Sequence, residues 1–201
     1  MAKNAHIDKR ELILKAAVKT FAHKGFHGTR VSDIAAEAGI AYGLIYHYFK
    51  NKEEILNAIF HDKWSLFLAI LRNIDRDNSD LRTKLLAIAT FFIDSYRQVP
   101  DLMEVLVLEI IHSSRFLEDK NLDAFRESFR IMEGIFERAQ DEGTLRKTMD
   151  ARVSSFLFLG SVETILTARI LDIVTPDYLA ELKSSLVDQF LYGISERTSS
   201  A

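Results

Sequence analysis

The sequence predicts an all-α protein, with a head of three short helices followed by a body of six longer ones. Apolar residues recur at helical spacing along most of the 201 residues, and no run with the two-residue period of a strand exceeds a few residues. Only 2 prolines and 8 glycines interrupt the chain, so long helices are expected.

The head, residues 1–52, divides into helices at its glycines. A first helix is expected between Asp8 and Gly25, because positions 13, 16, 17 and 21 form one apolar stripe. A second helix follows, with Thr29 or Ser32 as its N-cap. It ends at Gly39, a residue type suited to the left-handed conformation that ends a helix. A third helix is expected over residues 41–49.

The body, residues 53–201, is expected to be helical throughout. Pro100 separates two of its helices, and Pro176 stands at the first turn of the last one, where its missing N–H is harmless. The predicted spans are 53–73, 80–98, 101–115, 117–141, 150–174 and 177–195.

Composition and charge restrict the possible functions. Residues 1–53 carry 9 basic and 5 acidic side chains, whereas the whole chain has a net charge of −3, so a basic head precedes an acidic body. Such a head suits a polyanion. The chain has no cysteine, and neither a 20-residue apolar span nor a hydrophobic signal core is found in the sequence. We therefore expect a cytoplasmic protein with no membrane partner.

The two short helices joined at Gly39 are typical of a helix-turn-helix, the second helix of which reads DNA. Ile45 and Phe49 are four residues apart and are expected to face inward. The outward positions are then rich in aromatic and polar groups that suit phosphate contacts, and a glycine there permits close approach to the groove. The expected outward residues are Tyr42, Gly43, Leu44, Tyr46 and His47, with Lys50 and Lys52 supplying charge for the DNA backbone.

Residues 9–56 resemble the DNA-binding head of the tetracycline-repressor (TetR) family. The resemblance lies in Gly25-Phe26, in Val31-Ser-Asp-Ile-Ala-Ala-Glu-Ala-Gly39 and in Leu44-Ile-Tyr-His-Tyr-Phe-Lys-Asn-Lys-Glu-Glu-Ile55. It implies phosphate contacts around the second helix from Thr29, Arg30 and Ser32. It also places Tyr42, Gly43, Leu44, Tyr46, His47, Tyr48 and Lys52 at or near DNA.

Two departures from the family pattern bear on DNA reading. Ala41 stands where a serine cap is frequent, and Tyr42 and Leu44 replace the frequent lysine and threonine. The base preference therefore cannot be transferred from the family.

The resemblance implies a body that binds a small ligand between central helices and dimerises through its last two. The last helix has an apolar stripe, and residues 156–159 are apolar around the helix. The expected interface residues are Phe156, Leu159, Leu182, Leu186 and Phe190; the alternative is that these residues form core within one chain. The candidate ligand-binding residues are Glu109, His112, Ser113, Glu163, Thr164 and Thr167.

Two further patterns concern the ligand. Glu109 and His112 have the spacing of a helix-bundle metal motif, but a di-metal site needs two copies and the sequence has one, so no metal or cofactor is expected. Residues 108–114 and 158–166 resemble fatty-acid-degradation repressors of the FadR type, which respond to long-chain acyl-CoA. Ile111 stands where their pattern often has arginine, which removes a cation that a CoA phosphate could use.

The sequence thus predicts a dimeric repressor that binds a palindromic double-stranded DNA operator and is released by a small apolar effector, with acyl-CoA ahead of a planar drug. An enzyme is not expected, because no glycine-rich phosphate loop, nucleophile elbow or repeated metal-ligand spacing is found in the sequence. Two alternatives are a multidrug-sensing repressor of an efflux gene and a helical protein-binding adaptor. DNA binding through several basic residues must weaken steeply with salt, which distinguishes a repressor from an adaptor.

Overall fold

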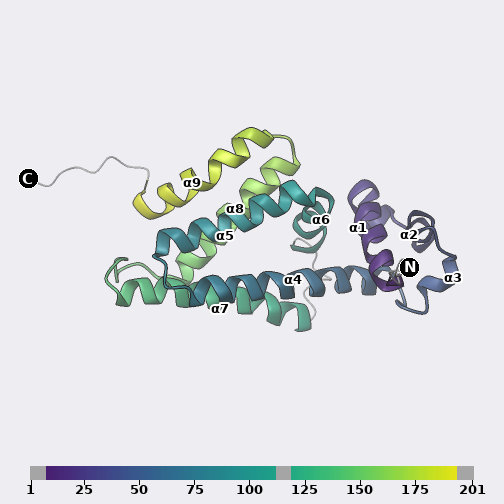
Figure 1. Cartoon of the computed structure of the whole chain (residues 1–201), viewed down its shortest axis with the longest axis horizontal. Helices are drawn as coiled ribbons and strands as arrows, with labels where there is room; N and C mark the ends of the chain where they lie inside the picture. Colours follow the sequence, from purple (N-terminus) through teal and green to yellow (C-terminus); the bar gives the residue numbers. More distant parts are fainter. Residues whose placement is uncertain (1–7, 112–118, 194–201) are drawn as a thin grey trace, which may run out of the picture. The chain divides into compact units, whose positions relative to one another are not determined.

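The computed structural model describes residues 8–111 and 119–193, and every regular element in these ranges is a helix (Figure 1). The predicted all-α fold class is therefore confirmed. The elements are α1 (Lys9–Gly28), α2 (Val31–Ala38), α3 (Tyr42–Ile45), α4 (Lys52–Arg76), α5 (Leu81–Gln98), α6 (Pro100–Glu104), the π-helix η1 (Val105–Ile111), α7 (Asp119–Asp141), α8 (Ala151–Ile170) and α9 (Pro176–Tyr192).

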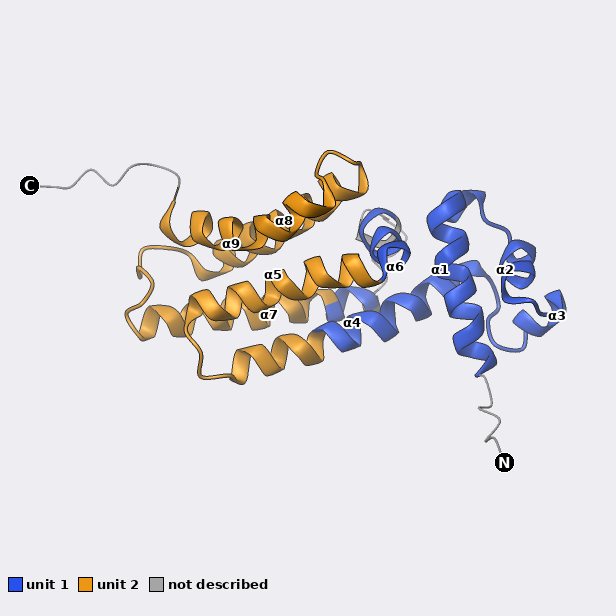
Figure 2. Ribbon diagram, turned by 45° about the horizontal axis from the view of Figure 1, so that its top comes forward, with its two compact units in different colours: residues 1–67, 99–124 blue, residues 68–98, 125–201 orange. Residues whose placement is uncertain are grey.

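The chain divides into two compact units (Figure 2). Unit 1 comprises residues 1–67 and 99–124, and unit 2 comprises residues 68–98 and 125–201. The first part of α4 therefore belongs to unit 1 and its last turns belong to unit 2. A functional division between residues 52 and 53 stays a prediction.

The core of unit 1 is built from the apolar faces of its helices. Ile13 of α1, Ile34 of α2, Ile45 of α3 and Ile55 of α4 are completely buried. Full burial of an isoleucine side chain contributes about 1.5–3 kcal/mol, so these residues fix the helices of the head on the start of α4. This core holds the predicted DNA-reading helix in place.

Unit 2 is held together by α5, α7, α8 and α9. Leu85 of α5, Phe136 of α7, Phe158 of α8 and Val187 of α9 are completely buried. An ion pair links α5 to α9. In this pair the Arg82 guanidinium donates to the Asp188 carboxylate at 2.8 Å. This pair is exposed to solvent, so its contribution is small beside that of the apolar core.

Most helix ends lie where local chemistry predicts them. The Asp150 carboxylate accepts the N–H of Val153 at 3.0 Å and begins α8, and the Asp80 carboxylate accepts the N–H of Thr83 at 2.7 Å at the start of α5. Pro176 occupies the first turn of α9, as expected.

α4 ends at Arg76 rather than residue 73, and α8 ends at Ile170 rather than residue 174. Two other helices differ more from their predicted spans. The third helix of the head ends at Ile45 rather than Phe49, because the N–H groups of His47 and Tyr48 bond to carbonyls three residues earlier and form tighter turns. The helix predicted over residues 101–115 is divided into α6 and the π-helix η1. An apolar pattern does not reveal whether backbone bonds span four or five residues, so η1 could not be foreseen.

Candidate functional site

The turn between α2 and α3 has the geometry of a helix-turn-helix. Gly39 ends α2 with φ 62° and ψ 35°, the left-handed conformation predicted for it. Its N–H bonds to the Ala36 carbonyl at 3.1 Å, and the N–H of Ile40 bonds to the Ala35 carbonyl at 3.1 Å. These two bonds satisfy carbonyls at the end of α2 and set the direction in which α3 begins.

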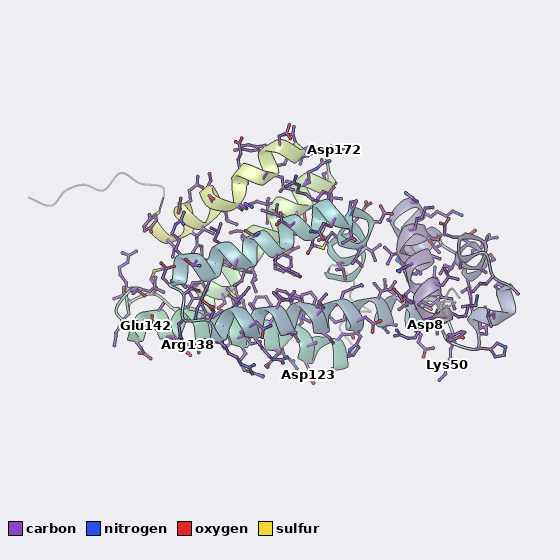
Figure 3. All side chains as sticks on the ribbon, in the orientation of Figure 1. Asp8, Lys50, Asp123, Arg138, Glu142 and Asp172 are labelled. Carbon is purple, nitrogen blue, oxygen red and sulfur yellow. The ribbon has the colours of Figure 1, made fainter. Side chains whose placement is uncertain are left out.

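One face of α3 and of the turn after it is exposed. The inward positions are as predicted, since Ile45 is 0% exposed and Phe49 is 4% exposed. Leu44 is half-buried. Lys50 extends from the segment that follows α3 (Figure 3). The exposed residues of the predicted DNA-binding set in this segment are Tyr42, Gly43, Tyr46, His47, Tyr48 and Lys50.

Tyr42 and Tyr46 form a pair on this exposed face. Their hydroxyl oxygens are 2.6 Å apart, and their rings meet edge to face with centroids 5.2 Å apart. The hydrogen bond between the two hydroxyls is the main cause that raises the pKa of Tyr46, so this phenol stays protonated at neutral pH. One hydroxyl proton is used between the two rings, and the other is available to a ligand.

Gly43 lies between the two tyrosines and is exposed. A Cβ atom at this position would have no heavy atom within 4 Å, so packing within the chain does not require a glycine here. A glycine on an outer helical face lets another backbone approach closely. Gly43 therefore fits a surface that meets a large partner.

The start of α2 differs from the prediction at Thr29. This side chain is 2% exposed, and its hydroxyl bonds to the carbonyls of Gly25 at 2.8 Å and Thr20 at 3.3 Å. It is neither the N-cap nor placed to reach a phosphate; it holds the end of α1 instead. The N-cap of α2 is Arg30, whose N–H donates to the Asp33 carboxylate at 2.8 Å.

Arg30 and Ser32 are exposed, as a phosphate contact requires. Asp33 also accepts from the Lys24 ammonium at 3.1 Å. The hydrogen bond from the Arg30 backbone, followed by the one from Lys24, lowers the pKa of Asp33 below its ordinary value. The carboxylate therefore stays ionised at the positive end of the α2 dipole, where a negative charge is favourable.

Lys52 does not extend toward solvent as a backbone-contacting cation would. Its ammonium donates to the carbonyls of Phe26 at 2.7 Å, Thr29 at 2.9 Å and His27 at 3.3 Å. It also lies 4.6 Å from the centre of the Phe26 ring. An ammonium has three donors, and all three are used inside unit 1, so the predicted phosphate contact from Lys52 does not fit this geometry.

The predicted ligand-binding residues are only partly described. His112 and Ser113 lie outside the described residues, and the backbone of Glu109 is described but its side chain is not. On α8, Glu163 and Thr167 are half-buried. Thr164 is exposed, and its hydroxyl donates back to the Gly160 carbonyl at 2.8 Å, so it fits an outer face of α8 rather than an interior pocket.

Sequence reasoning missed a buried aromatic row in unit 1. Phe60 and Trp64 of α4 stack with centroids 4.9 Å apart, and Phe67 meets Trp64 edge to face at 5.3 Å. The Trp64 indole N–H donates to the Ala124 carbonyl at 3.0 Å, which joins α4 to the start of α7. The spacing of four and then three residues along one helix was the signal that could have identified this row.

The predicted interface residues fall into two groups. Phe156 is 48% exposed, although it touches the Phe129 ring at 5.0 Å. Phe190 instead packs inside unit 2, with its ring 5.3 Å from Phe158 and 5.7 Å from Phe136. Phe190 is half-buried, and so are the remaining members Leu159, Leu182 and Leu186.

The exposed apolar side chains of α8 extend beyond this prediction. Val153 is 49% exposed and Leu157 is 58% exposed. Among the described helices, α8 is the one that is long and apolar enough to cross a membrane by composition alone, and 28% of its apolar window is buried within the chain. The other side of α8 packs in unit 2 through Phe158, so the exposed side is a face that another protein surface can cover.

Comparisons with known proteins find matching family models for residues 13–196. The family model described as "Bacterial regulatory proteins, tetR family" matches residues 13–59, and the model described as "YsiA-like protein, C-terminal region" matches residues 60–196. The chain is 30% identical over 156 residues to the HTH-type transcriptional repressor KstR2 of Rhodococcus jostii, covering 75% of this chain and 74% of that protein.

Two further matches cover nearly the full length. The fatty acid metabolism regulator protein of Bacillus subtilis is 28% identical over 185 residues, covering 92% of this chain and 95% of that protein. The crystal structure of the transcriptional regulator FadR from Bacillus subtilis, solved in complex with stearoyl-CoA, superimposes with a TM-score of 0.82. That match is 27% identical and covers 92% of this chain and 99% of the other.

Proposed function

Because the chain belongs to the TetR family of bacterial regulatory proteins and is a transcriptional regulator, we propose that it represses transcription by binding a palindromic operator as a dimer. We further propose that an acyl-CoA releases it from that operator. The exposed face of α3 is the main support for this proposal. It presents phenol hydroxyls, a histidine and an exposed glycine on a helix whose inner side is buried in the core of unit 1. Such a regulator works in the cytoplasm, where the chromosomal DNA lies.

The composition of the α3 face suits the groove of DNA. Tyr42 and Tyr46 offer hydroxyls for phosphate or base edges, and Gly43 removes the side chain that would hold the two backbones apart. Arg30 and Ser32 are exposed at the start of α2 and supply further phosphate contacts. Lys50 adds a positive charge on the segment after α3.

The dimer is supported by the exposed apolar face of α8. One short recognition helix reads only a few base pairs, and two copies related by a twofold axis read half-sites about 34 Å apart. Val153, Phe156 and Leu157 provide an apolar surface that a second copy can cover. A twofold dimer of this kind would cover the exposed apolar side of α8.

The effector proposal rests on the relatives of the chain. The FadR structure from Bacillus subtilis was solved with stearoyl-CoA, and the likeness extends over 92% of this chain. Ligand binding affects DNA only when the ligand favours one arrangement of the two heads over another. We propose that a long-chain acyl-CoA favours the arrangement that does not fit the operator.

The test combines operator selection with thermal shifts. Duplexes selected from a random library by the purified chain are expected to be palindromic, and their binding is expected to weaken steeply as salt rises. Acyl-CoA with 12 to 18 carbons is expected to raise the Tm and weaken operator binding, whereas free CoA does neither. A Tm shift with cationic dyes and none with any acyl chain would replace the acyl-CoA proposal with drug sensing. Failure to select any duplex would overturn the repressor itself.

A further inference from the structure

The corner between α1 and α2 has a feature that the DNA-binding face does not explain. The helix α1 contains Gly25 with φ 69° and ψ 159°, so the chain changes direction before its last turn. The carbonyls at the end of a helix lack partners within the helix, and they carry the negative end of its dipole. Phe26, His27 and Thr29 present three such carbonyls on one side of this corner.

Lys52, the first residue of α4, supplies the cation for this corner. Its ammonium contacts the three carbonyls at 2.7, 3.3 and 2.9 Å, across 23 to 26 residues of sequence. A cation at the C-terminal end of a helix is favourable both for the hydrogen bonds and for the dipole. The corner that leads directly into α2 is therefore bonded to the start of α4.

A second contact holds the other end of α1 on the same helix. The Arg10 guanidinium donates to the Asp62 carboxylate at 2.9 and 3.5 Å, and it lies 5.8 Å from the centre of the Phe49 ring. The hydrogen bond that Arg10 donates to the Asp62 carboxylate is the main cause that raises the pKa of Arg10. α1 is therefore attached to α4 near both of its ends.

We propose that Lys52 is a positioning residue for DNA recognition rather than a phosphate contact. Its ammonium fixes the α1–α2 corner on the first turn of α4. The corner in turn positions the exposed start of α2 and the α3 face. Because α4 continues into the part of the chain proposed to bind effector, the Lys52 contact is also the route by which a change in α4 reaches the DNA-binding face. This inference rests on the proposed repressor function.

The experiment compares Lys52→Met with Lys50→Met in the full-length chain. Methionine keeps most of the stem of lysine and removes the three donors, and each variant loses one positive charge two residues from the other. Lys50 is exposed and serves as the matched control. For Lys50→Met, the slope of log affinity against log salt is expected to decrease by about 1, as for a lost phosphate contact.

For Lys52→Met, four results are expected. The salt slope on non-specific duplex stays that of the wild-type chain, and affinity for the selected operator falls about tenfold, a typical consequence of losing hydrogen bonds to a charged group. The Tm falls, whereas Lys50→Met leaves it unchanged. The loss of operator affinity caused by dodecanoyl-CoA is smaller than in the wild-type chain, because α4 and the corner are no longer bonded.

A decrease of about 1 in the salt slope of Lys52→Met, with equal loss of affinity for all duplexes, would overturn the proposal. If Lys52→Met does not fold, Lys52→Arg replaces it. The planar guanidinium cannot direct three donors at three converging carbonyls, so reduced operator affinity with an unchanged salt slope is expected. Full operator affinity in Lys52→Arg would indicate a phosphate contact and overturn the proposal.

The proposal and the repressor function fail in different ways. If the wild-type chain binds no duplex, the repressor function is wrong. The Tm measurement then still tests the Lys52 contact, because it needs no DNA. Equal Tm values for Lys52→Met and the wild-type chain would overturn that contact as well.

Discussion

The outer faces of α3 and α8 expose large rings and aliphatic side chains to a similar degree, yet they differ in chemistry. Tyr42 and Tyr46 on α3 are 51% and 46% exposed, and Phe156 and Leu157 on α8 are 48% and 58% exposed. The rings exposed by α3 and the turn after it carry phenol hydroxyls or imidazole nitrogens, whereas the exposed apolar side chains of α8 carry no hydrogen-bonding group. The first face suits a hydrated polyanion, and the second suits a dry contact between proteins.

The two faces also differ in what a substitution can disturb. A side chain on either outer face can be changed without opening the core beneath it, since Ile45 and Phe158 are fully buried behind them. Binding and folding can therefore be separated experimentally at both faces.

The largest effect is expected from Leu157→Glu on α8. A glutamate at the centre of an apolar interface would be buried without a partner, so the dimer should dissociate. Operator affinity should fall by about 10³-fold, into the range of non-specific binding, because one head reads too few base pairs. Sedimentation and operator titration measure the two effects. The control is Leu66→Glu on α4, which is 55% exposed and should leave the dimer intact.

Phe190→Ala is expected to act on folding instead of assembly. The Phe190 ring packs against Phe136 and Phe158 within unit 2, so its removal opens a cavity and should lower the free energy of unfolding by about 2–3 kcal/mol. Phe156→Ala should cost less stability and weaken the dimer more. Chemical denaturation followed by sedimentation checks both. Dissociation of the dimer by Phe190→Ala with unchanged stability would contradict the packing argument.

Gly43→Ala is expected to separate stability from DNA binding. The new methyl group meets nothing within the chain, and alanine favours a helix over glycine, so stability should rise by about 0.5 kcal/mol. Operator affinity should fall about tenfold, because the methyl group holds the DNA away from the helix. Anisotropy titrations with operator and with unrelated duplex measure this loss. Unchanged operator affinity would remove Gly43 from the DNA-binding face.

The smallest effect is expected from Asp33→Ala, through pH. The pKa of Asp33 in the folded chain is lowered from 3.8, so its contribution to stability is complete above that value and is lost as pH falls through the lowered pKa. The Tm of the variant should be slightly below that of the wild-type chain at pH 7, and the difference should decrease as the pH falls below 3.8 toward the lowered pKa. Scanning calorimetry over this range checks it, and a constant difference would contradict the assignment.

Local sequence chemistry predicted a large part of the fold and some of the candidate site. Glycine at position 39 adopts the left-handed conformation, and the caps at Asp80 and Asp150 begin their helices where expected. Each of these depends on groups within about four residues of one another along the chain. The exposed positions of α3 followed from the same periodicity, because Ile45 and Phe49 defined the inward side.

The sequence alone determined the helical fold and the helix-turn-helix. Only the tertiary structure decided which side chains are free to act. Lys52 is a basic residue beside a DNA-reading helix, yet its ammonium is bonded to carbonyls 23 to 26 residues earlier. Thr29 is polar but buried, and Phe190 lies on an apolar stripe but packs inside unit 2. Periodicity fixes the direction of a side chain on its own helix, whereas the group that it meets depends on how distant segments pack.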